Sequence, residues 1–238
     1  MHTRSKLLNL AVLTTLALAA CGKPAPVAPA VDAAPAATEM AAQTRYKVEF
    51  TPAWTKANFP FEYPDTSLIH KPHFSGWIGT AHNDIYRIAQ AGTMPTPGLE
   101  NLSEMGKHDP LDAEIKAAIA AGNALALAES EPLKDFSQSV TFEISVDEAH
   151  PMAALVAMIA PSPDWFAGVD VNLMENGAFV ASKSVDVMAW DSGGDDGTTF
   201  LADDVDTNPK KPSMQSTGEH FMKDGTTMPV GTLSFTRM

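Results

Sequence analysis

The sequence holds a single cysteine, Cys21, in 238 residues. One cysteine excludes a disulfide scaffold, a zinc site built from several cysteines and a Cys-x-x-Cys redox pair. Basic residues are also scarce, since 16 Lys and Arg stand against 29 Asp and Glu, a net charge of −13. Nucleic-acid binding needs Lys and Arg to neutralise phosphates, so we expect no nucleic-acid partner. The hydrophobic fraction of 45% is that of a globular protein.

The N-terminus has an apolar stretch, 7–18, that is too short to span a bilayer as a stable helix. Arg4 and Lys6 precede it, so residues 1–20 are predicted to be a secretory signal. Small residues lead directly to Cys21, and this arrangement resembles the lipobox of bacterial lipoproteins. The resemblance implies that Cys21 is acylated and anchors the chain in the cell envelope, in the outer membrane. The alternative is a plain secretory signal in which the cysteine has no role.

Two further regions follow the signal. Residues 21–43 consist of the cysteine and a linker rich in Ala and Pro, without any aromatic residue. Proline favours extended conformations and cannot build a core, so the linker is expected to act as a tether. Residues 44–238 are long enough to bury a stable core without disulfides and are expected to form the folded domain.

The pattern of apolar residues in this domain indicates mostly strands. Alternation predicts half-buried strands over 46–50, 140–146 and 232–237, and the continuously apolar run 152–160 predicts a strand buried on both faces. Asn176-Gly177 is typical of a two-residue hairpin turn. Short helices are expected in one stretch, over 84–91, 99–105 and 110–121. The predicted fold is therefore mainly β, an antiparallel β-sandwich with a short helical insertion.

The segment 191–197 contains three carboxylates and three glycines, with the acids at Asp191, Asp195 and Asp196. Glycines allow tight turns, and Ca²⁺ prefers oxygen ligands from such loops. Two carboxylates about 4 Å apart repel by roughly 4 kcal/mol at an effective dielectric near 20, so converging side chains would need a cation. The spacing does not fit an EF-hand, because Asp196 stands where that loop requires glycine. A solvated acidic loop is the alternative.

A second segment, Ser162-Pro163-Asp164-Trp165-Phe166 with Gly168-Val169-Asp170, adds to this loop. Together the two segments resemble the spondin domain, the amino-terminal module of F-spondin and mindin. The opening strand at 46–50 and the closing strand at 232–237 fit the same family, whereas residues 203–229 match it poorly. The animal members also carry cysteines and thrombospondin repeats that this sequence lacks.

The resemblance implies an antiparallel β-sandwich with one Ca²⁺ at the end of its sheets. It places the metal ligands at Asp164, Asp191 and Asp195, and it leaves Asp196 and Asp170 as additional or supporting residues. The function it implies is a non-enzymatic, envelope-anchored, Ca²⁺-binding module for adhesion or for binding an unidentified protein or glycan. The partners of the animal proteins do not transfer.

Two other functions stay open on the sequence. The first is a secreted metal-dependent hydrolase, for which His82 or His150 would be the general base. The second is a purely structural envelope lipoprotein. His70 and His73 have a spacing that can begin a transition-metal site, but no other His or Cys stands at a matching offset, so a solvated pair is favoured.

Overall fold

The computed structural model describes residues 42–64 and 71–238. The predicted signal peptide, Cys21, almost all of the linker and His70 lie outside the described residues. Among the residues described, none of the helices has the length and apolar character needed to cross a bilayer.

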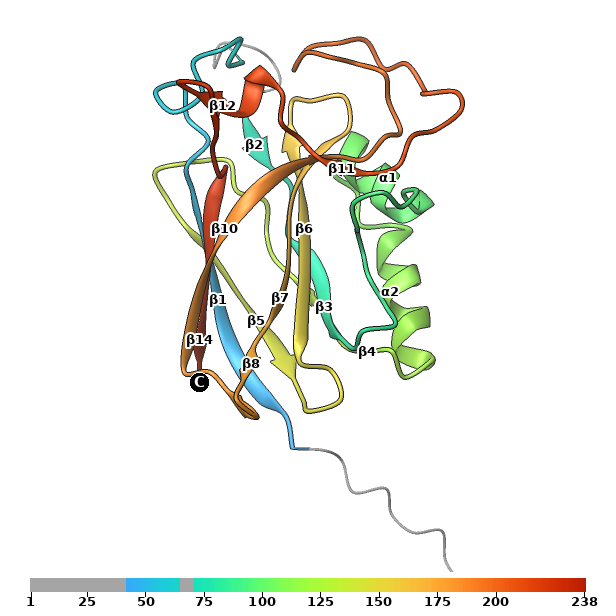
Figure 1. Ribbon diagram of the computed structural model, residues 1–238, viewed down its shortest axis with the longest axis vertical. Coiled ribbons are helices and arrows are strands. Elements are labelled where there is room, and N and C mark those ends of the chain that lie inside the picture. The colour runs from blue at the N-terminus through green and yellow to red at the C-terminus, as the bar shows by residue number, and fades with distance from the viewer. Residues whose placement is uncertain (1–41, 65–70) are drawn as a thin grey trace, which may run out of the picture. The chain divides into compact units, whose positions relative to one another are not determined.

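The domain consists mainly of strands, with two α-helices between β3 and β4 (Figure 1). The elements are β1 Thr44–Pro52, β2 His73–Phe74, β3 Ile78–His82, α1 Pro97–Met105, α2 Leu111–Ala120, β4 Ala124–Glu129, β5 Val140–Val146, β6 Met152–Ala160, β7 Trp165–Asn172, β8 Met174–Glu175, β9 Ala178–Phe179, β10 Ser182–Asp191, β11 Met214–Gln215, the 3₁₀ turn η1 Glu219–Phe221, β12 Met222–Lys223, β13 Thr226–Thr227 and β14 Gly231–Arg237.

The main strands follow one antiparallel path, β4-β3-β6-β7-β10-β14-β1-β5. Strand β10 belongs to both halves of this path, since residues 182–187 pair with β14 and residues 188–191 pair with β7. The two halves face each other across a core of buried aliphatic and aromatic side chains, including Phe50, Trp77 and Leu155. The mainly β, antiparallel sandwich with a helical insertion is confirmed, and β10 is the strand that joins its layers.

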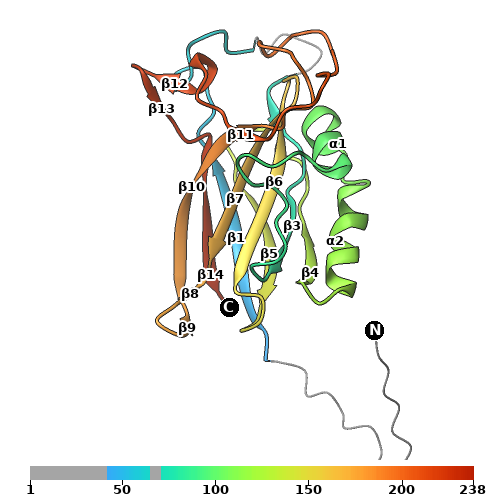
Figure 2. The ribbon, with the colours of Figure 1, turned by 45° about the vertical axis from the view of Figure 1, so that its right-hand side comes forward.

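Strand β6 explains why the helices pack where they do. Its side chains are buried along almost the whole strand, and alternate residues belong to different clusters. Leu155 faces the core between the layers, whereas Ala154 and Val156 join a second cluster with Leu102 of α1 and Ile115 of α2. The helices therefore cover the outer face of β3, β4 and β6 (Figure 2).

Local sequence signals set the ends of α1. The Thr96 hydroxyl accepts a hydrogen bond from the Leu99 amide at 3.1 Å, and Pro97 occupies the first turn, where its missing N–H is not needed. Gly106 ends the helix with φ +66°, a conformation that glycine adopts without steric cost. The predicted helix over 99–105 is confirmed, with its start two residues earlier.

The prediction of a helix over 84–91 was wrong, because this segment consists of turns and irregular chain. The Arg87 guanidinium donates hydrogen bonds to the backbone carbonyls of Asn83 and Tyr86, at 2.9 and 2.6 Å. In a helix these carbonyls would accept from backbone amides instead. Ile88 is buried against the outer face of the sheet. Strands β3 and β4 were not predicted, because β3 has only five residues, all buried, and β4 alternates between Ala and Leu, which are both apolar.

Candidate metal site at one end of the sandwich

The sheet brings the two predicted acidic segments to the same end. Asp164 directly precedes β7, and Asp191 is the last residue of β10. These strands are neighbours, and Asp191 pairs with Trp165 in their register. Asp164 and Asp191 are distant in sequence but close in space, because antiparallel strands place the start of one strand beside the end of its neighbour.

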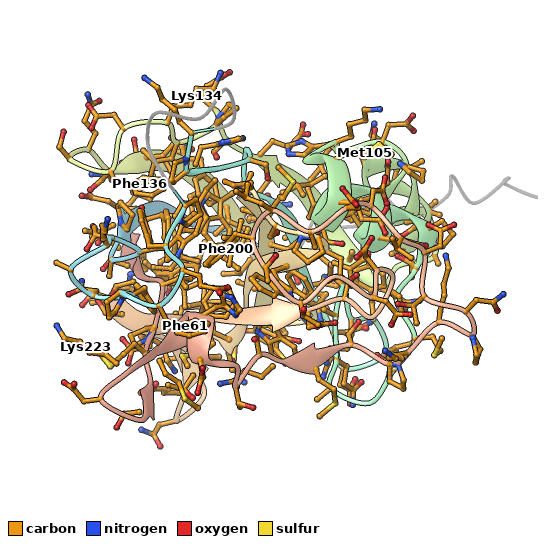
Figure 3. All side chains as sticks on the ribbon, turned by 90° about the horizontal axis from the view of Figure 1, so that it is seen from above. Phe61, Met105, Lys134, Phe136, Phe200 and Lys223 are labelled. Atoms are coloured by element: carbon orange, nitrogen blue, oxygen red, sulfur yellow. The ribbon has the colours of Figure 1, made fainter. Side chains whose placement is uncertain are left out.

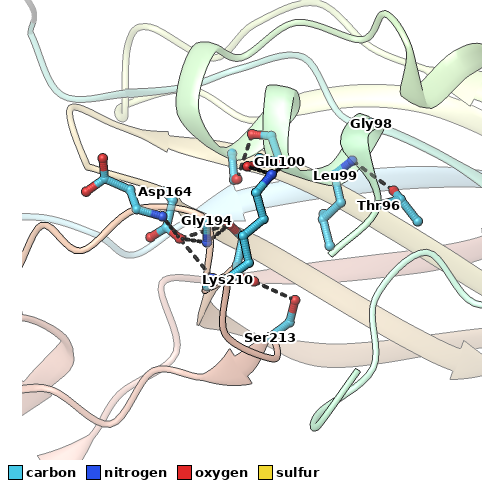
Figure 4. Close-up of polar contacts among 12 residues, drawn as sticks. Thr96, Gly98, Leu99, Glu100, Asp164, Gly194, Lys210 and Ser213 are labelled. Atoms are coloured by element: carbon cyan, nitrogen blue, oxygen red, sulfur yellow. Dashed lines mark hydrogen bonds and ion pairs between the residues drawn. The ribbon is translucent and has the colours of Figure 1, made fainter. Parts of the chain in front are cut away.

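Asp164 organises the glycine loop that follows β10. Its side chain is fully buried, and its Oδ2 accepts hydrogen bonds from the Ser192 hydroxyl at 2.8 Å and from the backbone amides of Gly193, Gly194 and Asp195 at 2.9, 2.9 and 3.2 Å (Figure 4). Gly193 has φ +85°, which lets successive amides point at one oxygen. The other oxygen, Oδ1, is buried and has no hydrogen-bond partner within the described part of the chain.

Asp191 lies next to this carboxylate. Its Oδ1 accepts a hydrogen bond from the same Gly193 amide at 2.9 Å. Burial and the negative charge of Asp164 raise the pKa of Asp191 to about 6. Burial likewise raises the pKa of Asp164, against the lowering effect of its hydrogen bonds from Ser192 and the loop amides. Burial therefore disfavours the charged form of both carboxylates, and the charge of Asp164 adds to this effect at Asp191.

Asp195 contributes to the loop in a different way. Its backbone amide donates to Asp164, but its own carboxylate accepts from the amides of Gly197 and, at 2.6 Å, Val205. Asp196 points to solvent and pairs with Lys211 at 2.5 Å. Of the predicted ligands, Asp164 and Asp191 are brought together, whereas the Asp195 carboxylate is engaged with the segment that follows it.

Asp170 does not belong to this site. It lies six residues beyond Asp164 along β7, which at about 3.3 Å per residue is about 20 Å away. Its carboxylate instead pairs with the Arg87 guanidinium at 3.1 Å and with the His82 ring at 3.1 Å. Because its strand is extended, Asp170 cannot share an ion with Asp164, and its assignment as an additional ligand is corrected here.

Helix α1 brings further acids to the loop that the sequence analysis did not single out. Glu100 and Glu104 are four residues apart, so they share the helix face toward the loop, and a Cβ added at Gly194 would lie 2.9 Å from Glu104 Oε1. Lys210 pairs with Glu100 (Figure 4), but Glu104 Oε1 is buried and has no hydrogen-bond partner among the residues that the structure describes. Burial, then the charges of Glu100 and other acids, raise the pKa of Glu104 to about 7.

The carboxylate oxygens at this end of the sandwich meet some, but not all, of the requirements of a Ca²⁺ site. Carboxylate oxygens are the ligands that Ca²⁺ prefers, and Asp164 Oδ1 is a buried carboxyl oxygen without a hydrogen-bond partner among the described residues. Within 42–64 and 71–238, however, no three His, Cys, Asp or Glu side chains converge as a metal site. Asp164 and Asp191 lie close together, whereas the Asp195 carboxylate accepts hydrogen bonds from the amides of Gly197 and Val205.

An open groove adjoins Asp191. Its volume is about 510 Å³, and its lining includes Trp165, Lys211, Met214 and His220. Sequence analysis did not single out His220, whose ring nitrogen lies 3.0 Å from a Glu62 carboxylate oxygen.

Aromatic side chains pack the same end of the domain. The centroid of the Phe200 ring lies 5.1 Å from that of Trp165 and 5.4 Å from that of Trp54. The Trp54 centroid lies 5.9 Å from that of Phe136. Figure 3 looks down on this end and shows Phe136 and Phe200. Rigid aromatic packing under the loops fixes the strand ends that carry the acidic residues.

Comparison with known proteins agrees with this architecture. The Spondin_N family model matches residues 44–225, which is most of the domain. The chain belongs to the Spondin_N family. The match ends before β14, although β14 pairs with both β1 and β10 in this spondin domain.

Curated relatives carry spondin names. Spondin-2 of Homo sapiens is 30% identical over 172 residues, covering 71% of this chain and 51% of the relative. Spondin-2 of Rattus norvegicus is 28% identical over 82% of this chain and 62% of its own length. Spondin-1 of Homo sapiens is 26% identical over 70% of this chain and 21% of the relative. The chain thus spans about half of the length of the Spondin-2 relatives.

Proposed function

We propose that this spondin domain is a non-catalytic binding module of the cell envelope in which one Ca²⁺, held between β7 and β10, fixes the loops that contact a partner. The observation that carries the proposal is the fully buried Asp164 carboxylate with an unpartnered Oδ1. A buried anionic oxygen without a partner is strongly unfavourable, and a divalent cation would compensate it.

Asp164 and Asp191 are the residues that would hold the ion. Asp195 would join them after its carboxylate releases the amides of Gly197 and Val205. Binding would offset the burial and the charge of Asp164, which together raise the pKa of Asp191. The metal's role would be structural, because it would order the glycine loop and one wall of the groove beside it.

The partner would contact the groove next to Asp191, whose exposed Met214 and Lys211 offer apolar and charged contacts. A protein or a glycan is the proposed class of partner, and the acidic chain speaks against nucleic acid. Acylated Cys21 would attach the domain to the membrane, since an acidic protein does not bind an anionic leaflet by charge.

The hydrolase alternative gains no support from the two histidines expected as bases. His82 is fully buried and bonded to Asp170, about 20 Å along β7 from Asp164. His150 is bonded to Asp147 and to the Gly122 carbonyl near the end of α2. Neither lies beside the carboxylates that would hold the metal.

Thermal unfolding with EDTA and with Ca²⁺ tests the proposed metal. A hundredfold excess over Kd should stabilise the wild type by about 2.7 kcal/mol, which for a domain of this size raises Tm by about 5–11 °C. Asp191→Asn should abolish this rise. Asp186→Asn is the matched control, because Asp186 is exposed on the same strand. An unchanged wild-type Tm, with no heat of Ca²⁺ binding in calorimetry, would refute the metal.

A further inference from the structure

A separate pocket lies on the outer face of the sandwich, away from the acidic loops. Its volume is about 290 Å³, near the lower end of the range for small-molecule sites. The segment 87–91, which runs from β3 toward α1 (Figure 2), forms one side. The outer face of β6, β7 and β10 forms the other, so four separate parts of the chain enclose the pocket.

The walls of the pocket are apolar, and two of them are aromatic. Phe166 and Trp190 are cross-strand neighbours whose rings lie nearly parallel, 6.1 Å apart at 18°. Ile88 and Val156 add aliphatic surface. Gly168 keeps the space open, because a Cβ there would already lie 3.1 Å from the Phe166 ring and a larger side chain would project into the pocket. Flat aromatic walls favour a flat ligand.

One end of the pocket is polar, and it offers a ligand mainly hydrogen-bond acceptors. The Arg87 guanidinium binds Asp170 through Nε at 3.1 Å and the carbonyls of Asn83 and Tyr86 through Nη1, while Nη2 contacts the Met152 sulfur at 3.8 Å. Four of its five N–H donors therefore have a partner in the protein, and the one on the Met152 sulfur is weak. The Asp170 carboxylate accepts from Arg87 and His82 but is 30% exposed, so it keeps acceptor capacity toward the pocket.

We propose that this pocket binds a small one- or two-ring aromatic molecule that donates a hydrogen bond, such as a phenol or an indole. The ring packs against Trp190, Phe166 and Ile88, and the donor group meets the Asp170 carboxylate. An aromatic carboxylate of the same shape binds more weakly, because its charge meets the Asp170 carboxylate while most donors of the Arg87 guanidinium already have partners in the protein. This site does not depend on the proposed Ca²⁺ site at the other end of β7.

Two naphthalene probes of nearly equal shape test the proposal. The ¹⁵N-labelled domain is titrated at pH 7 with 2-naphthol, which carries a donor, and with 2-naphthoate, which carries a negative charge. We expect 2-naphthol to shift the amide signals of Ile88 and Gly168 and the indole signal of Trp190. A hydrogen bond to a charged acceptor is worth roughly 1.5–3 kcal/mol, so 2-naphthoate should bind at least about tenfold more weakly.

Ala89→Phe places a ring in the pocket from the partly exposed 87–91 segment and should abolish the shifts. Ala113→Phe, on the exposed face of α2, is the matched control and should leave them unchanged. Intermolecular NOEs from 2-naphthol to the Ile88 methyl groups test the same contact in the wild type, whether or not the variant folds. Absence of shifts at these residues, or equal binding of the two probes, would overturn the proposal.

Discussion

Replacing Glu104 with Gln should stabilise the protein at neutral pH. Its Oε1 is buried without a hydrogen-bond partner, and it faces a loop that already holds other acids. Glutamine has nearly the same shape but carries no charge. The substitution therefore removes the repulsion and the desolvation of the carboxylate while it leaves the packing of α1 against the loop intact.

The magnitude follows from the pKa. Burial and neighbouring acids raise the pKa of Glu104 from 4.5 to about 7. A difference of this size corresponds to roughly 3 kcal/mol, and partial solvent screening lowers it to about 1–2 kcal/mol. Because the folded state holds this proton more tightly than the unfolded state, wild-type stability falls as pH rises from about 4.5 to 7. Below pH 4.5 the carboxyl is protonated in both states and the penalty is absent.

Urea unfolding in EDTA, followed by tryptophan fluorescence at pH 4 and pH 8, measures the effect. Glu104→Gln should match the wild type at pH 4 and exceed its unfolding free energy by about 1–2 kcal/mol at pH 8. Glu148→Gln is the control, since Glu148 is exposed and should change stability at neither pH. A variant that is less stable than the wild type at pH 8, or equally stabilised at both values, would refute the reasoning.

Two further predictions concern the loop and the N-terminus. Gly193→Ala should destabilise the domain by more than about 1 kcal/mol in urea unfolding, because φ is +85° and the added Cβ would lie 2.2 Å from the Lys211 carbonyl oxygen. Gly225→Ala, with φ +75° but open space, is its control, and equal losses in both variants would contradict the role of the close contact. Cys21→Ser should move the protein from the membrane fraction to the soluble periplasmic fraction, and mass spectrometry should detect acyl chains on the wild type only. Membrane attachment that persists in Cys21→Ser would disprove the lipid anchor.

Much of the fold could be predicted because its signals are local. Alternating side chains gave β1, β5 and β14, and the buried run gave β6, since each pattern follows from the two-residue repeat of a strand. Asn176 and Gly177 adopt positive φ values of 51° and 77°, as their hairpin turn requires. The helix predicted over 84–91 is absent from this segment, where the Arg87 side chain donates hydrogen bonds to carbonyls that helical amides would otherwise use.

The candidate site divides in the same way. The acidic glycine loop pointed to Asp191, the resemblance to the spondin domain pointed to Asp164, and strand pairing places the two together. Sequence did not reveal that Asp170 is carried about 20 Å away along β7, or that the Asp195 carboxylate bonds to the amides of its own loop. It also could not place Glu104, because only the packing of α1 on the outer face brings that helix to Gly194.

The amino-acid sequence by itself determined the strand pattern, the acidic composition and the family to which this chain belongs, because these depend on residue type and short-range spacing. The tertiary structure decided which acids meet, which oxygens lack partners and where the outer pocket opens. Those properties depend on the register between strands and on the helices that cover one face, and contacts between distant segments set both.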